Sequence, residues 1–397
     1  MHIRRLHLEN FRNFARLDLA LLAGPSVVVG GNAQGKTNLL EAVHLLSTLR
    51  SPLAAADADL ICWQAHSDPM PTARLVAEVQ RRSDAIRVEL VVAGYWVEAG
   101  ALHANKIVRI GGRPRRAAEA IGQMTSVFFT AQDLELLTGP PSLRRRYLDT
   151  TIAQVDRAYL RALQSYGKVL VQRNHLLRRI QEASARPDEL AYWDQELVRE
   201  GAYIVRTRAQ VVSALGRLAA EAQAALTGGR EGLMVTYKPQ VGSDVDGEAT
   251  ARLGEEEVAG ALAAALKRWQ PREIGAGTTL LGPHRDDLLF HIDGRPVAAF
   301  ASRAQQRTIA LSLRLAEAHY LRQRSDDAPI LLLDDILSEL DQSRRGAVLA
   351  AIAPYEQVLL TSTEVDRFHQ EFLERAAVFV VEEGAVKPWQ APRGGAG

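Results

Sequence analysis

The chain has 397 residues, of which 47% are hydrophobic and 24% are charged, and its formal net charge at pH 7 is +1. This composition can bury a large core, and at ~150 residues per domain the length predicts two or three domains. A single cysteine, Cys62, excludes an intrachain disulfide. No apolar run approaches the ~20 residues of a membrane span, and the first residues indicate a strand rather than a signal peptide. We therefore expect a cytoplasmic protein without a membrane partner.

Residues 30–37 follow the pattern G-x-x-x-x-G-K-T, which is typical of loops that bind nucleotide phosphates. The apolar run 26–29 precedes the loop as a predicted strand, and residues 38–46 continue it as a predicted helix. We expect Lys36 to neutralise the β- and γ-phosphates and the Thr37 hydroxyl to bind Mg²⁺. The alternative, an ordinary glycine-rich turn, needs no Lys-Thr pair. The predicted nucleotide-binding residues are Gly30, Gly31, Asn32, Ala33, Gln34, Gly35, Lys36 and Thr37.

A carboxylate normally steadies the Mg²⁺ ion at such a loop, and residues 328–335 provide a candidate. They form an apolar run that ends in Asp334 and Asp335, which is typical of a central strand in a buried parallel sheet. We expect Asp334 to bind Mg²⁺ and Asp335 to polarise the attacking water. The alternative is a strand that ends in a solvated acidic turn.

Two long helices are predicted between these motifs, since Thr37 and Asp334 lie 334 − 37 = 297 positions apart. Apolar residues recur at helical spacing over 151–180 and again over 190–226, and residues 186–188 interrupt the pattern. Charged residues fill the remaining faces, which favours an antiparallel hairpin over two helices inside one core. We therefore expect a nucleotide-binding head that is split by a helical insertion.

Five segments in the same order make the chain resemble the RecF family of bacterial DNA replication and repair proteins, relatives of the structural-maintenance-of-chromosomes ATPases. The segments are residues 8–14, 32–42, 139–149, 282–287 and 334–341, and the hexapeptide Gly-Pro-His-Arg-Asp-Asp at 282–287 is the most distinctive. The resemblance covers residues 1–382 and implies an α/β fold with an ABC-type P-loop ATPase head and an inserted antiparallel helical arm or lid. The implied division is a head at 1–138 and 273–383, an arm at 139–272, and a disordered tail at 384–397.

The resemblance also implies how ATP is bound and hydrolysed. Two heads would sandwich two ATP molecules, and each site would be completed by the partner's signature loop, here residues 301–308, from which Ser302 would donate to the γ-phosphate. Family members usually have glycine where Ala304 stands, and an alanine with positive φ would cost roughly 1 kcal/mol. Gln132 would contact water or Mg²⁺, and Arg12 and Asn38 the nucleotide. The alternatives are a helix N-terminus without any contact to a partner and, for Arg12, a surface residue.

The implied function is that of an ATP-switched clamp in recombinational repair and replication restart. A weak, Mg²⁺-dependent ATPase would drive homodimerisation on gapped or single-strand/double-strand junction DNA, aid recombinase loading and the SOS response, and act with the RecR and RecO mediator proteins. Two alternatives are a transporter-type ATP-binding subunit, which would lack the hexapeptide, and a nuclease-associated ATPase. The latter would need a further catalytic domain, for which the 397 − 341 = 56 residues after Asp341 are too few.

Three groups of arginines are candidate contacts to DNA phosphates, since a net charge of +1 confines any basic surface to local patches. No aromatic residues are interleaved with them, so we expect contacts that do not depend on base sequence. The alternative for each group is a solvated face. The groups are Arg109, Arg113, Arg115 and Arg116; Arg144, Arg145 and Arg146; and Arg173, Arg178 and Arg179.

Overall fold

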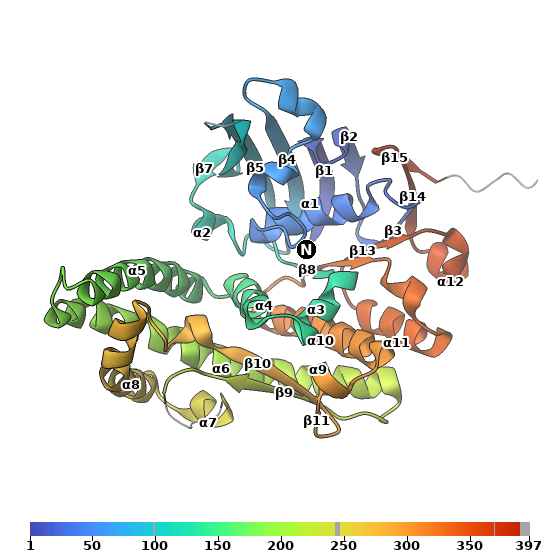
Figure 1. The fold of residues 1–397 in the computed structure, drawn as a ribbon. Coiled ribbons are helices and arrows are strands. Elements are labelled where there is room, and N and C mark those ends of the chain that lie inside the picture. Colours follow the sequence, from blue (N-terminus) through green and yellow to red (C-terminus); the bar gives the residue numbers. More distant parts are fainter. Residues whose placement is uncertain (98–99, 243–246, 369, 390–397) are drawn as a thin grey trace, which may run out of the picture. The chain divides into compact units, whose positions relative to one another are not determined.

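The computed structural model describes residues 1–97, 100–242, 247–368 and 370–389, and it divides into two compact units. The first unit combines residues 1–131 with the described residues from 321 onward, and the second contains residues 132–320. Figure 1 labels the elements of each unit. Residues 273–320, which we expected in the head, group with the helical unit because a strand in this segment pairs with a strand that follows the long helices.

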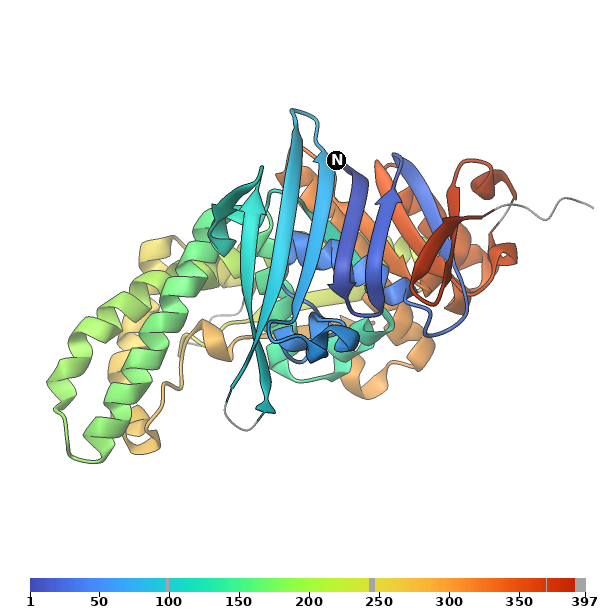
Figure 2. The same ribbon diagram turned by 90° about the horizontal axis from the view of Figure 1, so that it is seen from above.

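The first unit contains a six-stranded antiparallel sheet in the order β2-β1-β4-β5-β6-β7, whose strands lie side by side in Figure 2. The paired residues Leu17, Leu8, Leu75, Leu90 and Val108 form one buried apolar row across five strands. Alternating side chains are exposed, as expected for a sheet with one face on the core. The strands are β1 (His2–Phe11), β2 (Phe14–Ala20), β4 (Thr72–Gln80), β5 (Ala85–Trp96), β6 (Leu102–Ile110) and β7 (Arg113–Arg115).

A second, mainly parallel sheet in the same unit has the order β15-β14-β3-β13-β12-β8. Its central strands β12 and β13 are buried along almost their whole length and have apolar centres, because both of their faces are covered. The strands are β3 (Gly24–Val29), β8 (Ser126–Phe129), β12 (Ile330–Asp334), β13 (Gln357–Ser362), β14 (Ala377–Glu382) and β15 (Ala385–Pro388). Strand β15 corrects the expected tail at 384–397, since it pairs with β14; residues 390–397 lie outside the described residues.

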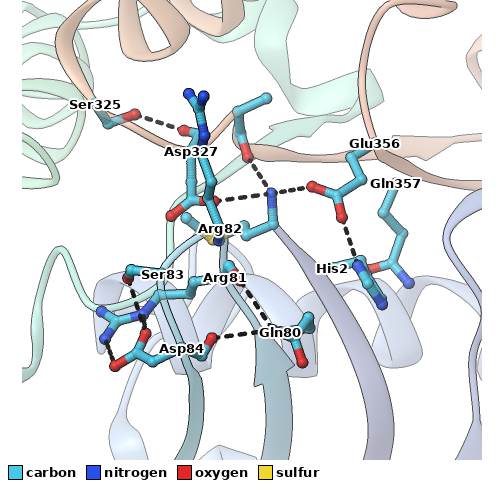
Figure 3. A network of polar contacts seen from close by, with 12 residues as sticks. His2, Gln80, Arg81, Arg82, Ser83, Asp84, Ser325, Asp327, Glu356 and Gln357 are labelled. Atoms are coloured by element: carbon cyan, nitrogen blue, oxygen red, sulfur yellow. Dashed lines mark hydrogen bonds and ion pairs between the residues drawn. The ribbon is translucent and has the colours of Figure 1, made fainter.

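Helix α1 (Lys36–Thr48) contacts strands of both sheets, and most of its residues are buried in their common core. The sheets are also joined where β1 begins. The Met1 amino group lies 2.5 Å from Glu356 Oε2, His2 Nδ1 lies 2.6 Å from Glu356 Oε1, and Gln357 exchanges two hydrogen bonds with the backbone of Ile3. Figure 3 shows the contact of Glu356 with His2 beside Asp327, which accepts from the Arg82 backbone N–H. Short helices complete this unit: α2 (Ala117–Ala120), α11 (Gln342–Ile352) and α12 (Gln370–Leu373).

The second unit is built around α5 (Arg157–Gln181) and α6 (Leu190–Thr227), which pack against each other as the predicted hairpin. The helix expected over 151–180 is interrupted, because Asp156 has an extended backbone and caps α5 by accepting from Tyr159 N at 2.8 Å. Gly228, at φ 63°, ends α6.

A three-stranded sheet and shorter helices pack around this hairpin. The sheet has the order β11-β10-β9, from β9 (Leu233–Lys238), β10 (Asp287–Ile292) and β11 (Arg295–Pro296). The helices are α3 (Leu134–Thr138), α4 (Pro141–Ala153), α7 (Gly247–Arg252), α8 (Glu255–Ala276), α9 (Val297–Phe300) and α10 (Arg303–Arg324). Across the described residues, no helix combines the length and apolar character that a membrane crossing requires.

Candidate functional site

The loop at residues 30–35 connects β3 to α1 and has little room for side chains at its two ends. A Cβ atom on Gly30 would lie 2.4 Å from the Val381 carbonyl oxygen, and one on Gly35 would lie 2.4 Å from Asn13 Nδ2. Gly35 also has φ 110° and Ala33 has φ 62°, so the loop curls through left-handed backbone positions. Glycine is therefore required at both ends of the loop for steric reasons.

Lys36 extends from the first turn of α1 back into the loop. Its Nζ donates to the carbonyl oxygens of Gly30 and Gly31, both at 2.7 Å. Burial lowers the pKa of Lys36, while the charges of Asp335 and Asp334 raise it. The ammonium group thus lies between the loop and the acidic strand end, where phosphate oxygens can replace the two carbonyl partners.

Thr37 and Asp334 meet although they come from opposite parts of the chain. Thr37 Oγ1 donates to Asp334 Oδ2 at 2.7 Å, and Thr361 Oγ1, from β13, donates to Asp334 Oδ1 at 2.7 Å. Thr361 Oγ1 in turn accepts from the Asp335 backbone N–H at 2.9 Å. One buried threonine thus orients the carboxylate of Asp334 and anchors the backbone of the next residue.

Asp335 differs from its neighbour because its carboxylate is not fully bonded. Its backbone is left-handed, with φ 52°, and its Oδ1 is buried without a hydrogen-bond partner among the described residues. A buried carboxylate oxygen in this state is costly unless a ligand or water supplies the missing hydrogen. The residue expected to polarise water therefore retains an acceptor that a water molecule can use.

The donors gathered here fit a magnesium nucleotide. Mg²⁺ takes oxygen ligands and is commonly held by one or two protein oxygens together with substrate phosphates. The Thr37 hydroxyl and the Asp334 carboxylate are such a pair. Within the described ranges, no group of three or more His, Cys, Asp or Glu side chains is arranged to hold a metal ion. A site that depends on phosphates for its remaining ligands is consistent with this donor set.

The other predicted loop residues divide into an exposed tip and a bonded base. Gly31, Asn32 and Ala33 are exposed, whereas Gln34 and Asn38 are partly buried. Asn13, which sequence reasoning did not select, donates to the Gln34 carbonyl at 2.9 Å and accepts from Asn38 Nδ2 at 2.8 Å. The Asn38 amide therefore stabilises the loop through Asn13 in this structure. A contact of Asn38 with a nucleotide stays a prediction.

Arg12 is engaged within the protein. Its guanidinium group forms two hydrogen bonds to Glu41 of α1, at 2.8 and 2.6 Å, and donates to the Asp59 carbonyl at 3.0 Å. Glu41 is fully buried and also accepts from Ser51 at 2.5 Å. A nucleotide contact by Arg12 stays a prediction, and it would require this guanidinium to share or exchange its bonds with Glu41.

Two predicted catalytic residues belong to the second unit. Gln132 is exposed in the short 3-10 helix Ala131–Asp133, and the neighbouring Asp133 accepts from Arg314 of α10 at 2.7 Å. Ser302 precedes α10 and caps it: Gln305 N donates to Ser302 Oγ at 3.3 Å, and Ser302 N donates to Gln305 Oε1 at 2.9 Å. Ala304 lies within this helix and has no positive φ, so the strain considered above does not arise.

The hexapeptide at 282–287 lies inside the second unit, where its charges meet buried partners. Asp286, 1% exposed, accepts from Arg208 Nη1 at 3.0 Å, from Gln240 N at 2.8 Å and from the Tyr237 hydroxyl. Arg208, 2% exposed, also donates to Asp149 at 2.8 Å. Burial raises the pKa of Asp286, although the charge of Arg208 opposes this. These residues organise the core of the unit.

The same segment holds a histidine in its neutral form. His284 Nδ1 lies 2.7 Å from the Tyr166 hydroxyl, and Nε2 lies 3.1 Å from the Thr279 carbonyl. Because a carbonyl can only accept, Nε2 carries the proton and Nδ1 accepts from tyrosine. Burial lowers the pKa of His284 to about 4.

Two of the candidate DNA-contacting arginines are instead structural. Arg173 is fully buried and pairs with Glu273 and Asp194, both at 2.7 Å, and Arg144 is 8% exposed and pairs with Asp287 at 2.6 Å. Neither can meet DNA phosphates in this fold. Six of the other candidates are exposed: Arg113, Arg115, Arg116, Arg146, Arg178 and Arg179.

The chain is similar to known proteins over its whole length. The model of the RecF/RecN/SMC N terminal domain matches residues 2–387. The DNA replication and repair protein RecF of Roseiflexus castenholzii is 44% identical over 399 residues, which cover 98% of this chain and 100% of that protein. The protein of the same name from Chloroflexus aurantiacus is 43% identical, over 97% and 99% of the two chains.

Solved structures agree with these relatives. The recombination mediator protein RecF with ATP, in the RecFOR pathway, superposes with a TM-score of 0.84 at 27% identity, over 98% of each chain. An SMC head bound to the C-winged helix domain of ScpA has a TM-score of 0.51 at 14% identity, covers 100% of this chain and 99% of that one, and shares the fold alone. The expected ABC-type α/β fold is confirmed. The chain belongs to the RecF/RecN/SMC family and, within it, to the RecF DNA replication and repair proteins.

Proposed function

We propose that the chain is an ATP-dependent DNA clamp of recombinational repair and replication restart. The observation that carries the proposal is the 2.7 Å hydrogen bond between Thr37 Oγ1 and Asp334 Oδ2, which brings the phosphate-binding loop and the acidic strand end into one site. The relatives solved with ATP and with ATPrS, at 27% and 28% identity, support ATP as the nucleotide.

The residues of this site have separate tasks. Thr37 and Asp334 would hold Mg²⁺, which neutralises phosphate charge when it is bound. Lys36 would leave the loop carbonyls for the β- and γ-phosphate oxygens. Asp335 would accept a hydrogen bond from the attacking water through its unbonded Oδ1, and so orient the water and share its proton.

Hydrolysis would require a second copy of the chain. The Ser302 oxygen accepts the cap bond from Gln305 N, which leaves the hydroxyl hydrogen available for a γ-phosphate on the partner. ATP would thus drive homodimerisation on gapped or junction DNA, and slow hydrolysis, with help from Gln132, would reset the clamp. On the basis of family membership we also propose recombinase loading, support of the SOS response and cooperation with RecR and RecO, with the cytoplasm as the site of action.

The proposal is tested by Lys36→Met, with Lys267→Met of an exposed lysine on α8 as the matched control. Removing the charge should weaken ATP binding about 10- to 100-fold, since a hydrogen bond to a charged group is worth roughly 1.5–3 kcal/mol. Dimer mass and DNA binding are measured with ATP, ADP and a non-hydrolysable analogue. A Lys36 variant that dimerises on DNA as well as the control would refute the clamp.

The shared site has its own test. Ser302→Arg should keep nucleotide binding by the monomer and abolish ATP-dependent dimerisation and hydrolysis. Mixing Ser302→Arg with Lys36→Met allows one intact composite site per heterodimer, so hydrolysis above the sum of the separate variants is expected. A Ser302→Arg protein that hydrolyses ATP normally by itself would exclude a role of Ser302 across the dimer.

A further inference from the structure

The two helices of the hairpin differ in charge. Helix α5, with 25 residues, contains six Arg or Lys residues and no Asp or Glu. Helix α6, with 38 residues, contains four arginines and four acidic residues. Its exposed Arg199 pairs with Glu196 at 2.6 Å and with Glu200 at 2.8 Å. A solvated helix commonly pairs its own opposite charges. Helix α6 does so, whereas α5 has no acidic residue of its own to pair with its cations.

Four of the six Arg and Lys residues of α5, together with His175, form a line on its exposed side. Five residues follow one another at intervals of 4, 7, 7 and 4, which returns each side chain to nearly the same direction. The opposite side of α5 is buried against α6 and α8, which lie together on one side of it in Figure 1. We name this line the α5 stripe; it consists of Arg157, Arg161, Lys168, His175 and Arg179, all exposed.

The cations of the stripe are not neutralised by the protein. Among the described residues, no ion pair involves Arg157, Arg161, Lys168 or Arg179, although Arg179 donates to the Ser184 carbonyl at 3.2 Å. The exposed large apolar side chains of α5 are limited to Val171. A protein interface usually buries an aromatic or apolar centre, whereas phosphates need only cations. A polyanion fits the stripe better than a protein surface does.

The length of the stripe indicates which polyanion fits. Its ends are 179 − 157 = 22 residues apart, or about 33 Å at ~1.5 Å per residue. One turn of B-form DNA spans about 34 Å. We propose that the α5 stripe binds the phosphate backbone of duplex DNA over about one helical turn, independently of base sequence. The proposal rests on the DNA clamp and specifies which surface of it contacts the duplex.

The experiment compares two double variants that remove the same charges from the two helices. Arg161→Gln with Arg179→Gln alters the stripe, and Arg199→Gln with Arg217→Gln alters exposed arginines of α6. Binding of a labelled DNA duplex is measured by fluorescence anisotropy at roughly 0.05 to 0.3 M salt. A non-hydrolysable ATP analogue is present throughout. Each lost phosphate contact lowers the salt slope by about 0.9, so the stripe variant should lose about 2 in slope and about 10- to 100-fold in affinity at ~0.1 M salt.

The readouts separate this proposal from the clamp itself. Hydrolysis and ATP-dependent dimerisation without DNA should be unchanged in both variants, which shows that the fold is intact. A parent protein that binds no DNA would overturn both the clamp and the stripe. If the parent binds and the two variants lose affinity equally, or neither does, only the stripe is overturned. A loss confined to single-stranded DNA would likewise reject the assignment to duplex.

Discussion

The phosphate-binding site of the first unit and the hexapeptide core of the second are both rich in charge, but their charges are satisfied differently. In the first, Lys36 is bonded only to loop carbonyls and Asp335 keeps a buried oxygen without a partner in the described structure. In the second, Arg208 and Asp286 are buried and bonded on several sides. The incomplete bonding of Lys36 and Asp335 leaves them available to a ligand, whereas the bonding of Arg208 and Asp286 holds the fold.

A distinctive motif is not by itself a functional site. The hexapeptide is the most specific sequence match in the chain, yet Asp286 and Asp287 pair with Arg208 and Arg144 inside the unit. The glycine-rich loop is a less specific sequence match, yet it holds the residues that are available to a ligand. Four substitutions test this difference.

Arg208→Met should be the most damaging change, because it leaves Asp286 and Asp149 without their cation. Removing one partner of a buried ion pair costs about 3–5 kcal/mol. We expect a loss of unfolding free energy of that size in chemical denaturation, with Arg199→Met, at an exposed position of the same helix, within about 0.5 kcal/mol of the parent. An Arg208→Met protein as stable as the parent would contradict the structural role of the buried charges in the second unit.

His284 makes the second unit sensitive to acid. The pKa of about 4 in the folded chain is below the ordinary 6.5, so the unfolded chain takes up the proton first as the pH falls. The stability contributed by neutral His284 is present above pH 6.5 and is lost as the pH falls through about 4. The loss amounts to up to about 3 kcal/mol, at about 1.4 kcal/mol per pKa unit.

The measurement is the unfolding free energy of the parent and of His284→Gln at several pH values in this window. Glutamine can bond Tyr166 and Thr279 but cannot titrate, so its stability should fall less steeply with acid. The neighbouring charges of Arg285, Arg145 and Arg173 add to the lowering of the His284 pKa. Parallel curves for the two proteins would show that His284 is not the acid-sensitive group.

Asp335→Asn tests the first unit at its unbonded oxygen. The amide keeps the shape and tolerates the left-handed backbone, but it is a poor acceptor for the proton of water. Hydrolysis should fall by ~10²-fold or more while ATP binding persists, and the dimer on DNA should live longer. Single-turnover kinetics and dimer lifetime are the measurements. Unchanged hydrolysis would move the catalytic role to Gln132 or another residue.

Thr361→Val removes the hydroxyl that orients Asp334 while preserving the side-chain volume. Loss of a hydrogen bond to a charged group, roughly 1.5 kcal/mol, should raise the Mg²⁺ concentration for half-maximal hydrolysis about 10-fold. Thr361→Ser should restore it. Thr151→Val is a matched control, since Thr151 donates to the buried carboxylate of Glu317 at 2.9 Å. An equal shift of the Mg²⁺ requirement in the control would contradict a positioning role for Thr361.

Local sequence patterns predicted the strand, loop and helix around Lys36, the acidic strand end and the helical hairpin. They did so because glycine, apolar periodicity and capping act over a few residues. Asn13 and Thr361 were missed, since their bonds to the Gln34 carbonyl and to Asp334 depend on strand pairing across the sheets. The burial of Arg173 was missed because a cation in an arginine-rich helix gives no local sign that Glu273 will reach it.

The order of strands in the parallel sheet bears on how the protein is made. Strand β3 is synthesised first in this sheet, yet its neighbours β13 and β14 are nearly last. At least 357 − 29 = 328 residues must leave the ribosome before Val27 and Val28 gain their first strand partner, which at ~5–20 residues per second takes roughly 15 to 65 s. Through that interval the apolar strand before the phosphate loop lacks its sheet. Nascent chains halted within the second unit should therefore depend on chaperones. The ATP site should be among the last parts of the molecule to fold.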